Sequence, residues 1–342
     1  MGGAVSAVRT LVALLRDPRR ARAVDPAHWT EVLAVARAET LAGTLAYRLE
    51  GLALPGEVVG ALAEARIDAA EARRTALWEA NRVALALRPL GHPVILLKGT
   101  AFVAAGLAAG QGRGIGDCDI LLPRPLLGHA EKLLVDAGWE WMKSDPYDDL
   151  YYRQWMHELP PLVHGERGRM VDVHHTILPL TARPTPDALA LIDDAEVLDG
   201  GLAVLCHTDM IVHAAAHLLA DGELAGGLRN LWDIHALIEE KGMEGLEVRA
   251  AHHGLSSAVD RALRLTHALY GTAVPARWRR LTMIDRLYRC RMTARDGWGR
   301  ERHKALRTVF YIRSHLIRMP LPMLIRHLWI KWRKAKATTG SG

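Results

Sequence analysis

The chain has 342 residues, of which 50% are hydrophobic and 24% are charged, and its formal net charge is +6. This apolar content excludes a largely disordered chain and is sufficient to bury a sizeable core. The three cysteines, at positions 118, 206 and 290, form no CxxC pair, which argues against a disulfide framework or a thiolate zinc site. No apolar run approaches the ~18 residues that span a bilayer. We therefore expect a cytoplasmic protein without a signal peptide.

The positive charge is concentrated at the C-terminal end. Ten lysines and arginines follow Glu301 and no acidic residue does, whereas the remaining 34 basic residues face 38 acidic ones. Residues 302–336, with a Trp-containing basic helix predicted at Ile325–Lys336, suit peripheral contact with an anionic membrane surface or an acidic partner. A solvated helical tail is the alternative. We expect no nucleic-acid partner, because no module for binding nucleic acid is recognisable.

The predicted elements form a helical segment, a mixed α/β core and a second helical segment. Before Arg88, apolar spacings of three and four predict about four helices, of which Asp68–Leu87 is the clearest. In the core, short apolar or alternating runs predict the following strands: Val94–Leu97, Asp117–Leu122, Trp139–Met142, Tyr151–Met156, Leu162–Val163 and Met170–His174. From Pro186 the pattern is helical again, most clearly at Val204–Leu219 and Leu228–Glu240.

These patterns predict an α+β fold in which a small mixed β-sheet is flanked by N- and C-terminal helical segments. The expected boundaries are 1–90 for the first helical region, 91–182 for the α/β core, 183–300 for a C-terminal helical domain and 301–342 for the basic tail.

Three aspartates carry the clearest chemical signal. Asp117 and Asp119 lie two residues apart in a predicted strand, so their carboxylates project from one face and repel each other unless a cation lies between them. Mg²⁺ prefers such oxygen ligands. Asp172 lies in another predicted strand, and three carboxylates on adjacent strands can hold two metal ions ~4 Å apart for an in-line phosphoryl displacement. The sequence therefore predicts a catalytic and metal-binding site at these aspartates.

Two basic segments upstream are candidates for binding phosphates. Lys98, Gly99 and Thr100 follow a strand and open a helix, where free backbone N–H groups favour an anion and a glycine permits its close approach. Arg113 lies in a loop of alternating glycines. This loop can fold over a triphosphate, and the arginine can neutralise the leaving pyrophosphate.

Together these motifs resemble the polymerase-beta-like nucleotidyltransferase superfamily. They are most similar to an uncharacterised nucleotidyltransferase-like family with a strand ending in Leu-Lys-Gly, an Arg, and then Asp-hydrophobic-Asp, here Leu97–Gly99, Arg113 and Asp117–Asp119. The resemblance covers roughly residues 94–238. Two features depart from the superfamily: Thr100 stands in place of Ser, and the spacing from Gly99 to Asp117 is longer than usual.

The resemblance extends downstream, where members carry His-x-x-x-His and then an Arg-Leu-x-Asp-like helix. The corresponding residues here are His213, His217, Arg229 and Asp233. The resemblance implies that they face the nucleotide or orient the acidic strands. His174 shares the face of Asp172 at two residues' distance, so we expect it beside the metal ions, as a supporting group or proton acceptor, with a purely structural role as the alternative.

The activity implied by the resemblance is Mg²⁺-dependent transfer of a nucleoside monophosphate from a nucleoside triphosphate such as ATP to an acceptor hydroxyl. Relatives of this kind tend to lie in gene clusters for surface polysaccharides or modified peptides, which implies a tailoring role. One alternative is a metal-dependent phosphohydrolase that uses His213, His217 and Asp233, because histidines at i and i+4 share a helical face. Another is a non-catalytic nucleotide-binding or regulatory protein attracted to a membrane by its basic tail.

Overall fold

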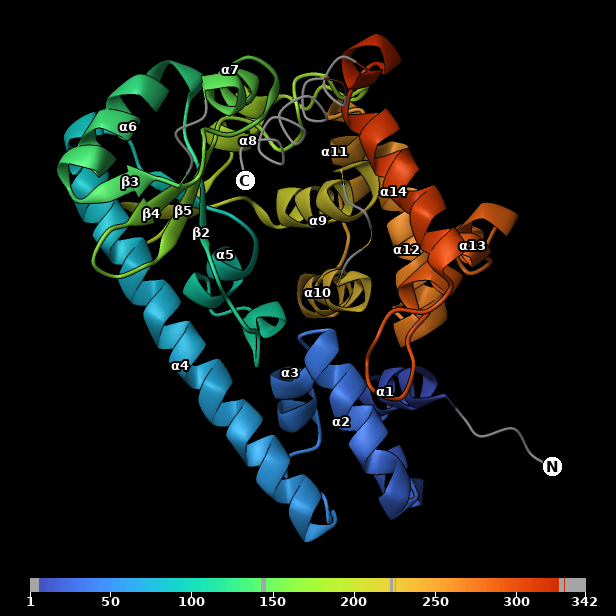
Figure 1. Ribbon diagram of the computed structural model, residues 1–342. Helices are drawn as coiled ribbons and strands as arrows, with labels where there is room; N and C mark the ends of the chain where they lie inside the picture. Colours follow the sequence, from blue (N-terminus) through green and yellow to red (C-terminus); the bar gives the residue numbers. More distant parts are fainter. Residues whose placement is uncertain (1–5, 143–145, 222–223, 225, 326–328, 330–342) are drawn as a thin grey trace, which may run out of the picture.

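A seven-stranded mixed sheet lies at one side of the molecule, and helices surround it (Figure 1). The computed structural model describes residues 6–142, 146–221, 224, 226–325 and 329. The strand order is β3-β4-β5-β2-β1-β7-β6, in which β2–β5 and β1–β7 are parallel pairs. This architecture confirms the predicted α+β class. The strands are β1 (Val94–Leu96), β2 (Cys118–Leu121), β3 (Trp139–Trp141), β4 (Leu162–His164), β5 (Met170–His174), β6 (Glu196–Val197) and β7 (Leu202–Val204).

The register of the central strands determines which side chains meet. All residues of β1 and β2 are buried, which explains why their apolar runs are nearly continuous. β2 pairs antiparallel with β1 and parallel with β5, and this second pairing sets Asp119 beside Asp172. Because side chains of paired residues project from the same face of a sheet, the two carboxylates are neighbours.

Four α-helices precede the sheet, as predicted. They are α1 (Ala7–Arg16), α2 (Trp29–Ala38), α3 (Ala42–Arg48) and α4 (Gly56–Leu87). α4 begins well before the predicted start at Asp68 and, with 32 residues, runs from the N-terminal helices to the sheet and α6 (Figure 1). Near its C-terminal end, the buried Glu79 accepts hydrogen bonds of 2.9 and 3.1 Å from Arg167, which lies between β4 and β5.

The remaining helices follow β1 along the chain. They are α5 (Lys98–Ala104), α6 (Leu127–Asp136), α7 (Pro146–Trp155), α8 (Ala188–Asp193), α9 (His207–Ala215), α10 (Gly227–Lys241), α11 (Leu246–His252), α12 (Ser256–Tyr270), α13 (Met283–Met292) and α14 (Lys304–Arg318). α9 and α10 lie between the sheet and α12–α14 (Figure 1). α1 packs against α12, so helices from both ends of the sequence share one apolar core that includes residues from Ala7 to Phe310.

Two segments differ from the secondary structure predicted for them. The predicted strand Tyr151–Met156 is wrong, because this segment belongs to helix α7. Its aromatic residues favoured a strand, but Tyr151 and Trp155 lie one helical turn apart with ring centroids separated by 5.8 Å, and Arg153 pairs with Asp149 at i,i+4.

Strand β7 was not predicted: it lies in a region predicted to be helical, and its last residue is the first of the predicted helix Val204–Leu219. That helix begins at His207 and continues as a π-helical turn, η7 (Ala216–Asp221). A three-residue buried strand cannot be distinguished from a buried helix segment by periodicity alone.

The basic C-terminal segment is described only in part. Most of the predicted helix Ile325–Lys336 lies outside the described residues, whereas α14 lies within them. In the part of the chain that the structure covers, no helix combines the length and the apolar character needed to cross a membrane.

Candidate active site

The structure brings Asp117, Asp119 and Asp172 together where β2 pairs with β5. Asp117 immediately precedes β2, Asp119 lies within it and Asp172 lies within β5. One carboxylate oxygen from each residue lies within 4.8 Å of the others. Three oxygen donors at this separation can coordinate a divalent cation.

The three carboxylates have different electrostatic environments. Asp119 is 2% exposed and accepts hydrogen bonds from Lys98 Nζ at 2.5 Å and His174 Nε2 at 3.0 Å. Burial alone would raise the pKa of Asp119, but the charge of Lys98 and the contact with His174 hold this pKa well below its usual range. Asp119 is therefore an ionised carboxylate.

For the other two carboxylates, the effects that raise the pKa outweigh those that lower it. Burial, together with the negative charges of Glu158 and Asp119, raises the pKa of Asp172 to about 7. The pKa of Asp117 is also raised, first by burial and then by Asp119. Within the described part of the chain, Asp172 Oδ1 is buried without a hydrogen-bond partner. An orphaned oxygen among crowded carboxylates is the environment that a bound cation would satisfy, so these residues fit a metal ion.

Two neighbouring residues, His157 and Glu158, were not identified from the sequence. With His174 they form a second group whose side-chain atoms are close enough to hold a metal ion. Glu158 Oε2 lies 3.5 Å from His174 Nε2, and the ring centroids of His157 and His174 are 5.1 Å apart. Glu158 is thus a fourth carboxylate beside the aspartates. The distance in sequence between the His157-Glu158 pair and Asp172 follows no known motif. The sequence therefore offered only the adjacency of two potential metal ligands as a sign of this group.

The turn from β1 into α5 positions the Lys98 ammonium group beside Asp119. Lys98 adopts a φ of 50°, a left-handed conformation that is uncommon for residues other than glycine. The preceding Leu97 donates its backbone N–H to the Asp119 carbonyl at 2.9 Å. Thr100 is buried, and its hydroxyl donates to the Asp117 carbonyl at 3.3 Å. The Lys98–Thr100 segment therefore anchors the backbone that carries both aspartates.

Gly99 makes room for Arg113. A Cβ atom at position 99 would overlap the Arg113 side chain, so only glycine permits this approach. The Arg113 guanidinium lies 5.7 Å from the ring centroid of Phe102 and pairs with Asp233. Its buried Nε has no partner among the described residues. The glycine loop thereby holds Arg113 in the interior rather than in solvent.

A buried network of ion pairs also holds the Arg113 guanidinium in position. Asp233 Oδ2 accepts from Arg113, and Oδ1 accepts from Arg229 at 2.6 Å. Arg229 also donates to Thr44 Oγ1 at 2.6 Å and to the Ala109 carbonyl at 3.4 Å. Arg229 and Asp233 are each 3% exposed. This network connects α3, α10 and the segment before the glycine loop, so its first effect is to position Arg113.

The two predicted histidines line a small cavity next to Lys98. The cavity has a volume of about 40 Å³ and is lined by Lys98, Phe102, Arg113, Met210, His213, Ala214, His217, Asn230 and Asp233. His213 lies in the last turn of α9, and His217 lies in the π-helical turn. Burial, followed by the charge of Lys98, lowers the pKa of His213 well below its usual value, so its ring is neutral.

Comparison with known proteins identifies the family. The family model described as "Uncharacterised nucleotidyltransferase" matches residues 25–271. The chain belongs to this family. The search of curated proteins and the search of solved structures gave no match. The range matched by the nucleotidyltransferase family extends from before α2 to the end of α12 and contains every candidate site residue described above.

The crowding of carboxylates predicts that Asp172→Asn stabilises the metal-free protein. An acid whose pKa is higher in the folded protein than in the unfolded chain, here about 7 against ~3.9, destabilises the fold progressively as the pH rises between these values. In EDTA at pH 8, the variant should melt about 3 °C or more above the parent, and this difference should shrink at pH 5. Mg²⁺ should raise the melting temperature of the parent only.

Circular dichroism at both pH values measures these melting temperatures. Asp68→Asn, which changes an exposed aspartate on α4, serves as the matched control. A variant that is less stable than the parent at pH 8, or that keeps the full response to Mg²⁺, would contradict this description of the site.

Proposed function

We propose that this protein is a Mg²⁺-dependent nucleotidyltransferase that moves a nucleoside monophosphate from a nucleoside triphosphate to an acceptor hydroxyl. The observation that carries the proposal is the cluster of Asp117, Asp119 and Asp172 with its orphaned carboxylate oxygen, in a chain of the nucleotidyltransferase family. Phosphoryl transfer requires mainly positioning and neutralisation of charge, and both are available from the residues around this cluster.

The three aspartates would hold the Mg²⁺ ions, of which we expect two. When bound, Mg²⁺ supplies neutralisation of the phosphate charge and polarisation of the reacting oxygens. We assign Asp172 to the acceptor side, because its Oδ1 is the oxygen left without a partner. His174 would hold Asp119 in orientation through its Nε2–H, supported by Glu158.

The basic side of the site would receive the phosphates. Lys98 and Arg113 line one cavity with the histidines of α9 and η7, and both carry the positive charge that a leaving pyrophosphate requires. In the chemical step, the acceptor hydroxyl loses its proton to the Asp172 carboxylate and its oxygen forms a bond to the α-phosphorus. The bond from the α-phosphorus to the bridging oxygen of the β-phosphate breaks, and pyrophosphate carries away the electron pair. Arg113 is held for this purpose by Asp233 and, through it, by Arg229.

The acceptor is the finer part of the proposal. We propose a hydroxyl-bearing sugar or peptide in a tailoring pathway, in accordance with the resemblance to proteins encoded beside surface-polysaccharide and modified-peptide genes. The geometry favours the transferase over a phosphohydrolase centred on His213, His217 and Asp233. Both oxygens of Asp233 are engaged by arginines, which leaves this carboxylate poorly suited to bind a metal ion.

The double substitution Asp117→Asn with Asp119→Asn should reduce transfer by about a thousandfold or more, because the oxygen ligands for the metal lose their charge. Binding of each nucleoside triphosphate with Mg²⁺ is measured by calorimetry, and incorporation of α-³²P label is measured across hydroxyl acceptors. The exposed pair Asp68→Asn with Asp199→Asn is the control. Unchanged turnover in the site variant, or no binding of Mg-nucleotide by the parent at millimolar concentration, would refute the proposal.

Lys98 should compete with metal ions for Asp119. Lys98→Met removes the ammonium 2.5 Å from this carboxylate, so binding of Mn²⁺ without nucleotide should tighten about tenfold. Nucleotide binding and transfer should weaken, because a phosphate contact is lost. Lys98→Arg keeps the charge and serves as the control. Titration of Mn²⁺ by electron paramagnetic resonance measures the first effect, and an affinity that falls in Lys98→Met would exclude this competition.

A membrane contact of the basic segment is a separate proposal. On α14, Val309, Ile312 and Leu316 are 61%, 51% and 44% exposed and share one helical face. Since no acidic residue follows Glu301, this face suits an anionic membrane surface. The protein should sediment with vesicles containing phosphatidylglycerol and not with neutral vesicles. Ile312→Asp should abolish sedimentation, whereas Val197→Asp, at an exposed site on β6, should not. Equal sedimentation of both variants would contradict the proposal.

A further inference from the structure

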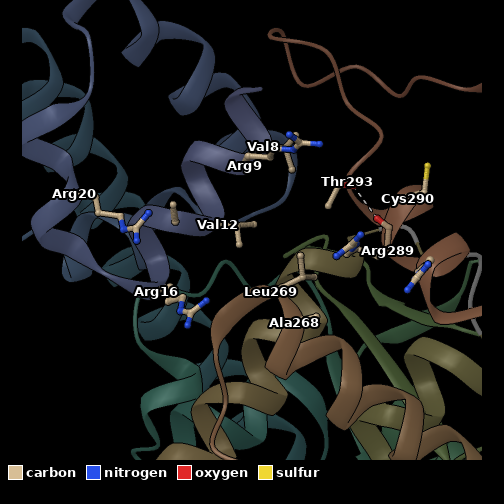
Figure 2. A pocket seen from close by; sticks show the side chains of 12 residues that line it. Val8, Arg9, Val12, Arg16, Arg20, Ala268, Leu269, Arg289, Cys290 and Thr293 are labelled. Carbon is tan, nitrogen blue, oxygen red and sulfur yellow. Dashed lines mark hydrogen bonds between the residues drawn. The ribbon is translucent and has the colours of Figure 1, made fainter. Parts of the chain in front are cut away.

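A second cavity lies between α1, α12 and α13, and none of its lining residues belongs to the candidate active site (Figure 2). Its volume is about 500 Å³, within the range of ~300–1,000 Å³ that is typical of small-molecule sites. α1 and α13 each pack against α12. Helices from the two ends of the sequence therefore build the cavity together.

Five arginines line this cavity, and none of its lining residues is acidic. They are Arg9 and Arg16 on α1, Arg20 after α1, and Arg286 and Arg289 on α13. All five side chains are exposed. Arg20 lies 3.8 Å from Asp17, whereas Arg9, Arg16 and Arg289 have no carboxylate partner within the part of the chain that the structure covers. Apart from Arg20, the arginines around this cavity have no carboxylate partner among the described residues, so their positive charges are not compensated.

Packing of α1 and α13 against α12, rather than attraction between charges, sets the positions from which these arginines project. Arg9 and Arg16 are two helical turns apart on α1, and Arg286 and Arg289 are one turn apart on α13, so each pair shares a helical face. α13 is anchored to α12 by the buried Asp285, which accepts from Arg261 at 3.0 Å and from Arg264 at 2.6 Å. The packing of the helices thus keeps the positively charged arginines near one another, and a bound anion would reduce the repulsion between them.

The floor of the cavity is apolar. Val8 and Leu269 are 1% and 8% exposed, and Val12, Ala13 and Ala268 complete the floor. Figure 2 shows Val12 and Leu269 between Arg16 and Arg289. A simple inorganic anion would leave this floor uncovered, whereas a ligand with an apolar body would bury it.

We propose that this cavity binds a small phosphorylated amphiphile, a molecule that carries a mono- or diphosphate on an apolar chain. Arginine suits such a ligand, because its planar guanidinium donates two hydrogen bonds to one phosphate. The apolar chain would lie on Val12 and Leu269, with the phosphates between Arg9, Arg16 and Arg289. This site is independent of the nucleotidyl transfer proposed for the acidic cluster.

Geranyl diphosphate is a suitable probe, with inorganic pyrophosphate and geraniol as its charged and apolar halves. Calorimetry with the full chain in EDTA should show one binding site, at least about tenfold tighter for geranyl diphosphate than for either half. The triple variant Arg9→Gln, Arg16→Gln and Arg289→Gln should weaken binding about tenfold or more. Arg22→Gln, Arg37→Gln and Arg302→Gln, which remove the same charge from exposed positions outside the cavity, should not.

Cys290 provides an independent reporter, because it is exposed and lines the cavity. Geranyl diphosphate should slow its alkylation by N-ethylmaleimide, as measured by peptide mass spectrometry, both in the parent and in the double variant Asp117→Asn with Asp119→Asn. Equal affinity for pyrophosphate, equal losses in the two arginine variants, unprotected Cys290, or binding abolished by the aspartate substitutions would each overturn the proposal. The last outcome would assign the ligand to the acidic cluster instead.

Discussion

The site depends on carboxylates that the sheet forces together. Parallel pairing of β2 with β5 sets Asp119 beside Asp172, and Asp117 joins them from the residue before β2. Like charges in a partly buried position repel more strongly than in water. Among the described residues, Asp119 alone of the three has a cationic partner, Lys98, together with a hydrogen bond from His174. Burial, followed by repulsion from the neighbouring carboxylates, raises the pKa values of the other two. The fold therefore holds the carboxylates close together at a position where a bound divalent cation would offset their repulsion.

The buried ion pairs that Asp233 forms with Arg113 and Arg229 act differently from the crowded aspartates. Buried ion pairs contribute little net stability, because both charges lose their hydration. These ion pairs instead orient the Arg113 side chain. They connect the loop that carries Arg113 with α10 and, through Thr44, with α3. The N-terminal helices therefore take part in positioning the basic side of the site. The family model begins at residue 25, upstream of the sheet.

The sequence was sufficient for the α+β class, for most strands and for the convergence of the three aspartates, because all of these depend on local periodicity and on side chains that alternate between the faces of a strand. The sequence was not sufficient where tertiary contacts determine the secondary structure or the proximity of side chains. The helical conformation of Tyr151–Trp155 requires its neighbours, and β7 is too short to carry a periodic signal. The proximity of Glu158 to Asp172 follows from an isolated bridge between Glu158 and His174. Similarly, the contact of Gly99 with Arg113 could not be inferred from a glycine turn.

The central claim is that divalent cations bind among the three aspartates, and diffraction tests it most directly. A crystal of the full chain with Mn²⁺ and a non-hydrolysable nucleoside triphosphate analogue would be measured at the manganese absorption edge. Our description predicts anomalous peaks between Asp117, Asp119 and Asp172, with the triphosphate extending towards Lys98 and Arg113. A well-ordered nucleotide elsewhere, with no peak at the aspartates and the contact between Lys98 and Asp119 intact, would contradict it.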